Sequence, residues 1–140
     1  MNDVVWNKKE SIERCVRQIR KYYNERRADL PFAEDHLTQD AVAINIQRAC
    51  EQAIDLANYT IKTQRYGLPK ESRESFRLLA ENHIIPTELA ENLAKMVGFR
   101  NTLVHEYQQL DIGIMTDVIE NHLEVLITFT NCILRVFEGE

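Results

Sequence analysis

Residues 36–65 read HLTQDAVAINIQRACEQAIDLANYTIKTQR, a run of thirty residues without glycine or proline. Apolar side chains recur in it at intervals of three, four and their multiples, at Leu37, Ala41, Ile44, Ile54, Ala57 and Ile61. This spacing places them along one face of a helix. A glycine and a proline follow at Gly67 and Pro69 and provide a stop signal. The stretch therefore predicts one helix of about 28 residues.

Four more segments show the same helical periodicity, at residues 7–28, 71–81, 86–107 and 111–137. Pro31 separates the first from residues 36–65, and Pro86 opens the fourth helix of the chain. No segment of any length alternates apolar and polar residues as a strand does. We therefore expect an all-α fold, an up-and-down bundle of about five helices, in a single domain spanning residues 1–140.

The composition of the chain restricts the class of protein to which it can belong. The chain has 140 residues and 44% apolar content, enough for one packed core. No apolar run approaches the roughly 20 residues that cross a bilayer, and the N-terminus lacks an apolar signal segment, so we expect a cytoplasmic protein without membrane contact. Cys15, Cys50 and Cys132 lie too far apart for a zinc motif or a disulfide framework, and we interpret them as core or near-core residues.

Charge is unevenly distributed along the chain. The net charge is −5, yet residues 8–27 contain eight bases and three acids, a local balance of +5. Within this stretch Arg14, Arg17, Arg20 and Lys21 are candidates for RNA binding, because a basic helix on an acidic body guides a polyanion to one face. The alternative is a solvated helix face with ion pairs between Glu10 and Arg14 and between Glu13 and Arg17, four residues apart.

Several chemistries are excluded by the motifs. None of the four histidines follows a glutamate at three residues, as a di-iron bundle requires. The H-E-x-x-H, phosphate-loop, G-x-G-x-x-G and G-x-S-x-G patterns do not occur either. We therefore expect neither a metal site nor a cofactor.

Polar side chains interrupt the apolar periodicity in residues 99–107, FRNTLVHEY. On an ideal helix Arg100 and Tyr107 share one face, and Asn101 and His105 share a neighbouring one. Arg100 and His105 diverge by about 140°. They serve one substrate only if the helix is irregular, if the long arginine reaches across, or if a second subunit completes the site. Gly98 just upstream loosens the helix or admits another backbone.

The residue types in this stretch suit phosphodiester chemistry. A histidine titrates near neutrality and can take or give a proton. An arginine directs a fixed fork of donors at phosphate oxygens. Asn101 is placed to hold the ring of His105 in one tautomer. From spacing alone, a helix in which Arg100 and His105 only satisfy nearby carboxylates and carbonyls remains the alternative.

The string Arg100-Asn101-Thr102-Leu103-Val104-His105-Glu106-Tyr107 resembles the R-x4-6-H signature of the HEPN superfamily of helical ribonucleases, in the R-x4-H-x-Y form of the HepT toxins. The similarity extends over residues 12–137. It includes Ala53-Ile54-Asp55-Leu56-Ala57-Asn58, Ser75-Phe76-Arg77-Leu78-Leu79-Ala80-Glu81 and Met96-Val97-Gly98-Phe99-Arg100-Asn101. HepT toxins are bacterial proteins encoded beside a minimal nucleotidyltransferase (MNT) antitoxin.

The resemblance implies roles for four residues. Arg100 and His105 would be the catalytic pair of a metal-independent endoribonuclease, and Asn101 would support them. Tyr107 matches the position at which the antitoxin attaches AMP. The family acts as a homodimer whose two signatures face each other across a cleft, and its partners are RNA and the nucleotidyltransferase. A non-catalytic alternative remains, in which the chain binds a nucleotide or docks onto a nucleotidyltransferase and the pair only grips a phosphate.

Overall fold

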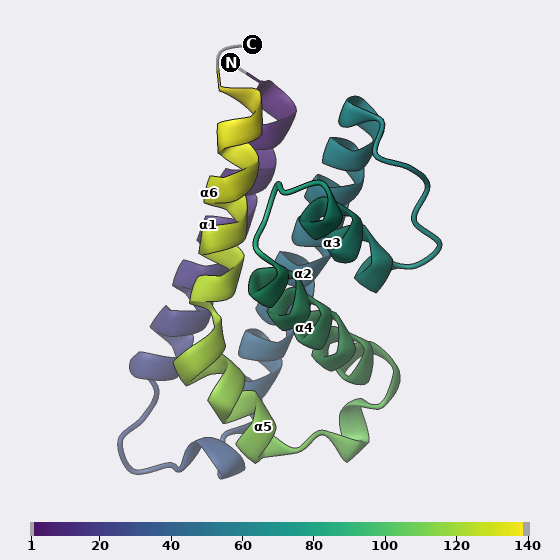
Figure 1. Ribbon diagram of the computed structural model, residues 1–140. Helices are drawn as coiled ribbons and strands as arrows, with labels where there is room; N and C mark the ends of the chain where they lie inside the picture. The colour runs from purple at the N-terminus through teal and green to yellow at the C-terminus, as the bar shows by residue number, and fades with distance from the viewer. Residues whose placement is uncertain (1, 139–140) are drawn as a thin grey trace.

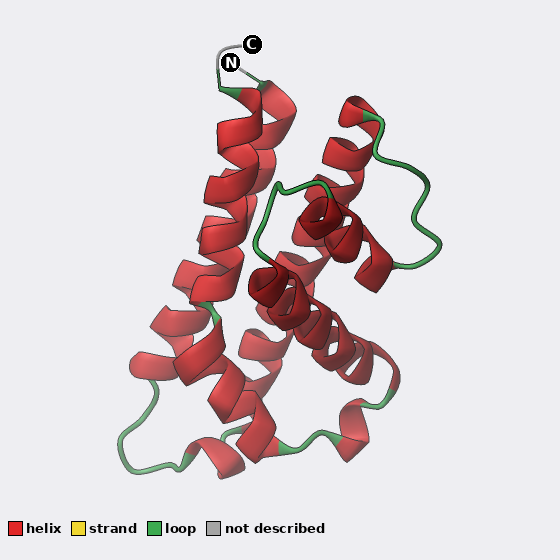
Figure 2. Ribbon diagram, in the orientation of Figure 1, coloured by secondary structure: helices red, strands yellow, loops and turns green. Residues whose placement is uncertain are grey.

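The computed structural model describes residues 2–138, and every regular element within this range is helical (Figure 2). The α-helices are α1 (Asp3–Asn24), α2 (His36–Gln64), α3 (Ser72–Glu81), α4 (Thr87–His105), α5 (Ile112–Asp117) and α6 (Glu124–Phe137). Short 3-10 turns lie at Phe32–Glu34 and Tyr107–Gln109. The expected all-α bundle is confirmed. No helix in this range is both long enough and apolar enough to cross a bilayer.

Helix α2 is the central element, because α1, α3, α4 and α6 all pack against it (Figure 1). Its first turn is capped by the Asp35 carboxylate, which accepts a hydrogen bond from the backbone nitrogen of Thr38 at 3.0 Å. It ends at Gln64, and the left-handed φ of 60° at the next residue, Arg65, stops the helical pattern two residues before Gly67. The predicted bounds of this helix are therefore close to those observed.

The predicted buried stripe of α2 is correct in its second half and wrong in its first. Ile54, Ala57 and Ile61 are buried, but Leu37 is 82% exposed and Ile44 is 39% exposed. The buried positions of the first half lie on another face, at Val42, Ala43, Ile46, Ala49 and Cys50. Neighbours approach α2 from several sides, so apolar residues occupy more than one of its faces. Periodicity alone does not indicate which face a neighbour covers.

The segment predicted as one helix over residues 111–137 is divided in the structure. A π-helical turn at Val118–His122 separates α5 from α6. Such a turn accommodates an extra residue in the helix, and here the adjacent Val118 and Ile119 are both buried. The apolar spacing continues across the turn, so the sequence pattern carries no sign of the interruption.

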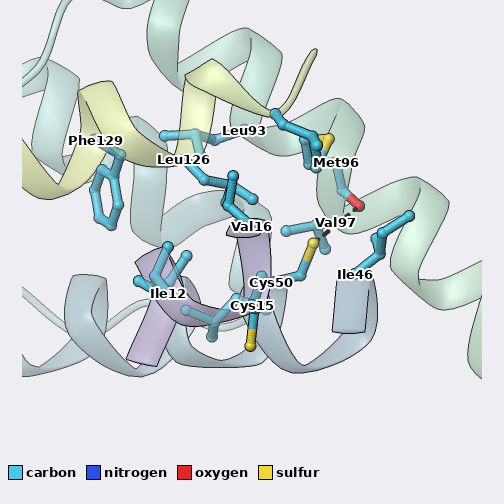
Figure 3. Packing of buried hydrophobic residues seen from close by; sticks show 14 of the residues in the cluster. Ile12, Cys15, Val16, Ile46, Cys50, Leu93, Met96, Val97, Leu126 and Phe129 are labelled. Atoms are coloured by element: carbon cyan, nitrogen blue, oxygen red, sulfur yellow. Dashed lines mark hydrogen bonds between the residues drawn. The ribbon is translucent and has the colours of Figure 1, made fainter. Parts of the chain in front are cut away.

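All six α-helices contribute buried side chains to the core. Figure 3 shows side chains of α1, α2, α4 and α6 meeting in it: Ile12, Cys15, Val16, Ile46, Cys50, Leu93, Met96, Val97, Leu126 and Phe129. Cys15 and Cys50 are buried free thiols and Cys132 is half-buried, as the sequence predicts. Phe76 of α3 meets Phe129 of α6 edge to face, with ring centroids 5.4 Å apart, and this pair joins the α3 side of the bundle to α6.

Replacing Phe129 with alanine tests this core. The ring is fully buried, so the change removes its apolar contacts and leaves a cavity, and we expect a loss of about 3–5 kcal/mol in the free energy of unfolding. Urea denaturation followed by circular dichroism measures it. Thr128→Ala, at the exposed preceding position, serves as control and should stay within about 0.5 kcal/mol of the parent protein. Equal stabilities of the two variants would contradict the packing described.

Candidate active site

Helix α4 carries the polar signature in its last two turns. Leu93, Met96 and Val97 anchor it in the core, and Leu103 is buried beside the signature itself. Arg100 and Asn101 are half-buried, and His105 is the exposed last residue of the helix. Because the apolar side of α4 is buried in the core, its polar residues lie at or near the surface.

Arg100 has a buried donor without a partner. Among residues 2–138, its Nε makes no hydrogen bond and is shielded from solvent. Burial raises the pKa of the Cys50 thiol on α2 to about 12. The positive charge of Arg100 lowers this pKa, but by less than burial raises it. Arginine stays charged and has five N–H donors to satisfy. A buried donor left unpaired in a native fold calls for an explanation, and a role in binding an anion is one.

Asn101 and His105 are near each other on the helix, but no hydrogen bond joins them within residues 2–138. The supporting role of Asn101 therefore stays a prediction. The next signature residue along the turn, Thr102, donates its hydroxyl to the carbonyl oxygen of Gly98 at 3.4 Å. His105 at the helix terminus has its ring exposed, which suits a group that exchanges protons with a ligand.

Tyr107 does not continue the helix, so the prediction that it shares a helical face with Arg100 is wrong. Helix α4 ends at His105, and Tyr107 begins the 3-10 turn Tyr107–Gln109. The turn returns its side chain to α2, where the hydroxyl donates to the carboxylate of Asp40 at 2.5 Å. Partial burial, followed by the hydrogen bond to Asp40 and the negative charge of that residue, raises the pKa of Tyr107 to about 12. Tyr107 is thus held as a neutral phenol.

A shallow hollow of about 230 Å³ surrounds this contact, lined by Asp40, Ala43, Ile44, Gln47, Leu103 and Tyr107. Leu103, three residues after Arg100 on α4, lines the same hollow as Tyr107. Asp40 was not predicted, because nothing in a sequence links residues 67 positions apart.

The basic first helix is not brought beside the signature. Arg14, Arg17, Arg20 and Lys21 are exposed on α1, which packs mainly on α2 and α6, whereas α4 packs mainly on α2, α3 and α6. Arg20 pairs with Glu124 of α6 at 3.2 Å. The alternative intrahelical pairs did not form either, since Glu13 pairs with Lys9 at 2.8 Å rather than with Arg17. The RNA-binding assignment of these four residues remains untested.

Gly98 is approached by a side chain rather than by another backbone. A Cβ atom built on it would lie 3.4 Å from an Nη atom of Arg73 of α3. Arg73 therefore lies across α4 two residues before Arg100. The sequence analysis did not single out Arg73, and only the packing of α3 on α4 reveals the contact.

Comparison with known proteins identifies the group to which this arrangement belongs. The family described as "Ribonuclease HepT-like" matches residues 12–133. The chain belongs to the HepT-like ribonuclease family. The resemblance read from the signature is confirmed, and so is the expectation that the chain is a ribonuclease.

Individual members of the HepT-like family cover nearly the whole chain. The mRNA nuclease HepT of Shewanella oneidensis is 44% identical over 124 residues, which are 89% of this chain and 91% of the relative. The tRNA nuclease HepT of Aphanizomenon flos-aquae is 28% identical over 77% of this chain and 72% of its own length. A solved structure of the tri-AMPylated Shewanella oneidensis HEPN toxin in complex with MNT antitoxin superposes with a TM-score of 0.89 at 42% identity, covering 96% of this chain and 99% of that one.

The contact between Tyr107 and Asp40 predicts the titration of the phenol. In Asp40→Asn the negative charge and the carboxylate acceptor are lost, so the pKa of Tyr107 should fall from about 12 toward its ordinary value near 10. A ¹³C NMR titration of tyrosine-labelled protein measures it, with Tyr107→Phe assigning the signal. Asp55→Asn, an exposed aspartate on the same helix, should leave the titration unchanged. An unaltered pKa in Asp40→Asn would mean that the hydrogen bond does not form in solution.

Proposed function

We propose that this HepT-like chain is the toxin of a toxin–antitoxin pair, a metal-independent endoribonuclease that is neutralised by a nucleotidyltransferase antitoxin. The observation that carries the proposal is the buried, unpartnered Nε of Arg100, five residues before the exposed His105 on α4. A charged donor that lacks an acceptor is suited to a phosphodiester, and the titratable ring of His105 on the same helix is suited to proton transfer. The RNA substrate would be met in the cytoplasm.

The proposed reaction needs a proton acceptor, a charge stabiliser and a proton donor. His105 removes the proton from a ribose 2′-hydroxyl, and the 2′-oxygen attacks the adjacent phosphorus. Arg100 stabilises the negative charge that develops on the phosphoryl oxygens. The bond to the 5′-oxygen breaks, and that oxygen takes a proton from a second donor, His105 of another copy of the chain. The products carry a 2′,3′-cyclic phosphate and a 5′-hydroxyl.

A homodimer accounts for two features of the single chain. Leu37 and Ile44 of α2 and Val104 of α4 are exposed apolar side chains, and Ile44 lies in the hollow beside Tyr107. Exposed apolar side chains of this size favour association. In addition, Arg100 and His105 diverge by about 140° on their helix, so two facing signatures complete a site more easily than one.

Tyr107 is the proposed attachment point for AMP. The Shewanella oneidensis relative in the solved complex is described as a tri-AMPylated toxin with MNT antitoxin. Here Tyr107 is 37% exposed at the end of α4, two residues beyond His105. A nucleotide added to its hydroxyl would replace the bond to Asp40 and place a bulky anion beside the active cleft. The modification would thereby stop RNA from entering.

Alanine substitution of the pair tests the catalytic proposal. Without His105 the general base is lost, and without Arg100 the developing charge is unbalanced, so each change should slow cleavage by about 100-fold or more. The assay follows a fluorescent RNA, and mass spectrometry identifies the cyclic phosphate end. His122→Ala removes a histidine paired with Asp117 elsewhere on the surface and should cut normally. If His105→Ala cleaves as fast as the parent, the mechanism is wrong; if the parent binds RNA without cutting it, the chain is a binding module.

The same variants reveal whether the site is shared. If the pair acts across the interface, a mixed dimer of Arg100→Ala and His105→Ala protomers contains one composite site with Arg100 and the base His105 intact. The second His105 is missing from that site, so the 5′-oxygen must take its proton from water and activity should recover only in part. If the pair acts within one chain, the mixed dimer contains no site with both groups. Recovery of activity on mixing supports the shared site, and continued inactivity of the verified mixed dimer contradicts it.

Incubation with the nucleotidyltransferase and ATP tests the modification site. We expect the intact mass of the chain to increase by one or more AMP units and the increase to disappear in Tyr107→Phe, because the attacking hydroxyl is missing. Tyr66→Phe, at a half-buried tyrosine on the loop after α2, is the matched control. An unmodified chain that is still neutralised by its partner would show that inhibition works by binding alone.

A further inference from the structure

A groove of about 320 Å³ between α3 and α4 contains a surplus of positive charge. Its lining residues are Arg73, Arg77, Glu91, Ala94, Lys95 and Gly98. The three basic side chains are exposed, and within residues 2–138 none of them forms an ion pair. Glu91 is the acidic group on this lining. The groove therefore offers unneutralised cations on a chain whose net charge is −5.

The groove leads to the catalytic histidine along one face of α4. Gly98 and His105 are seven residues apart, which places them within about 20° of each other around the helix and about 10 Å apart along it. Asn101 and Thr102 lie between them. A ligand that follows this face from the groove thus arrives at His105.

Gly98 allows the cations to lie close to this path. Because it has no side chain, the guanidinium of Arg73 rests against α4, with its Nη 3.4 Å from where a Cβ would be. Arg77, one helical turn later on α3, extends the basic edge beside Lys95. Arg77 also borders a second hollow, which is lined by Lys70, Leu78 and three acids, Glu71, Glu74 and Glu81. Acids outnumber bases there and would repel a polyanion, which leaves the groove beside α4 as its route.

We propose that this groove binds the phosphate backbone of the RNA strand that is cut, with Arg73, Arg77 and Lys95 as phosphate ligands. The proposal rests on the proposed ribonuclease function and names the path of its substrate. Arginine forks match phosphate oxygens, and a row of cations provides affinity without reading bases. The basic stretch of α1 is a poorer candidate, because α1 packs mainly on α2 and α6 rather than on α4 and Arg20 is occupied by Glu124.

A binding measurement in a catalytically inactive background tests the groove. The dimeric His105→Ala protein is titrated with a fluorescein-labelled single-stranded RNA, and anisotropy is recorded at several salt concentrations. Adding Arg73→Ala and Arg77→Ala should weaken binding at least tenfold and reduce the salt slope by about 1.4, since each single-stranded phosphate contact contributes about 0.7. The matched control, Arg14→Ala with Arg17→Ala on α1, should stay within twofold. Thermal unfolding checks that all variants are folded.

The outcomes separate the two proposals. The proposal that the groove binds RNA is overturned if the groove variant binds RNA with unchanged affinity. It is also overturned if the α1 control loses more RNA affinity than the groove variant. If the groove variant binds RNA normally but no longer binds the nucleotidyltransferase, the surface serves protein docking and the RNA-binding proposal is wrong. Cleavage by the parent chain is measured separately. If the parent binds RNA through the groove without cutting it, the ribonuclease mechanism is wrong and the RNA-binding proposal for the groove still holds.

Discussion

The burial of α2 is the constraint on which the rest of the structure depends. This helix is contacted by α1, α3, α4 and α6, and its buried residues run from Gln39 to Ile61. A 140-residue bundle can bury such a length only by laying its other helices along it. The cost is that one face of the first half, with Leu37 and Ile44, is left apolar and exposed in the single chain. The same constraint thus creates both the core and the surface that favours a second copy.

The geometry of the proposed active site is set by the packing of α4 against α2. Burial of Met96, Val97 and Leu103 sets the rotation of α4, and this rotation carries Arg100 toward α2 with its Nε out of reach of water. An unsatisfied buried donor costs on the order of 1–3 kcal/mol. Such a cost is common where a binding group is preorganised. The proposed phosphodiester substrate would satisfy this donor.

Charge is distributed in three dimensions differently from its distribution along the chain. The most basic stretch of sequence lies on α1, which packs mainly on α2 and α6 rather than on α4, and part of it is neutralised by Glu124. Arg73 and Arg77 of α3 stand among acids in the sequence, yet both line a groove beside α4 in which basic side chains outnumber acidic ones. A negative net charge is therefore compatible with a nucleic-acid substrate, because the local surplus is what a polyanion meets.

The sequence by itself determined the helical class, the bounds of α2 and the family signature. Spacing, stop residues and the residue types of Arg100, His105 and Tyr107 are local properties that a chain carries before it folds. Tertiary structure decided the rest: the exposure of Leu37, the π turn at Val118–His122, the release of Tyr107 from the helix, and its bond to Asp40. Each of these depends on which neighbour covers which helix face. That choice minimises the exposed apolar surface of the whole chain, so no local pattern contains it.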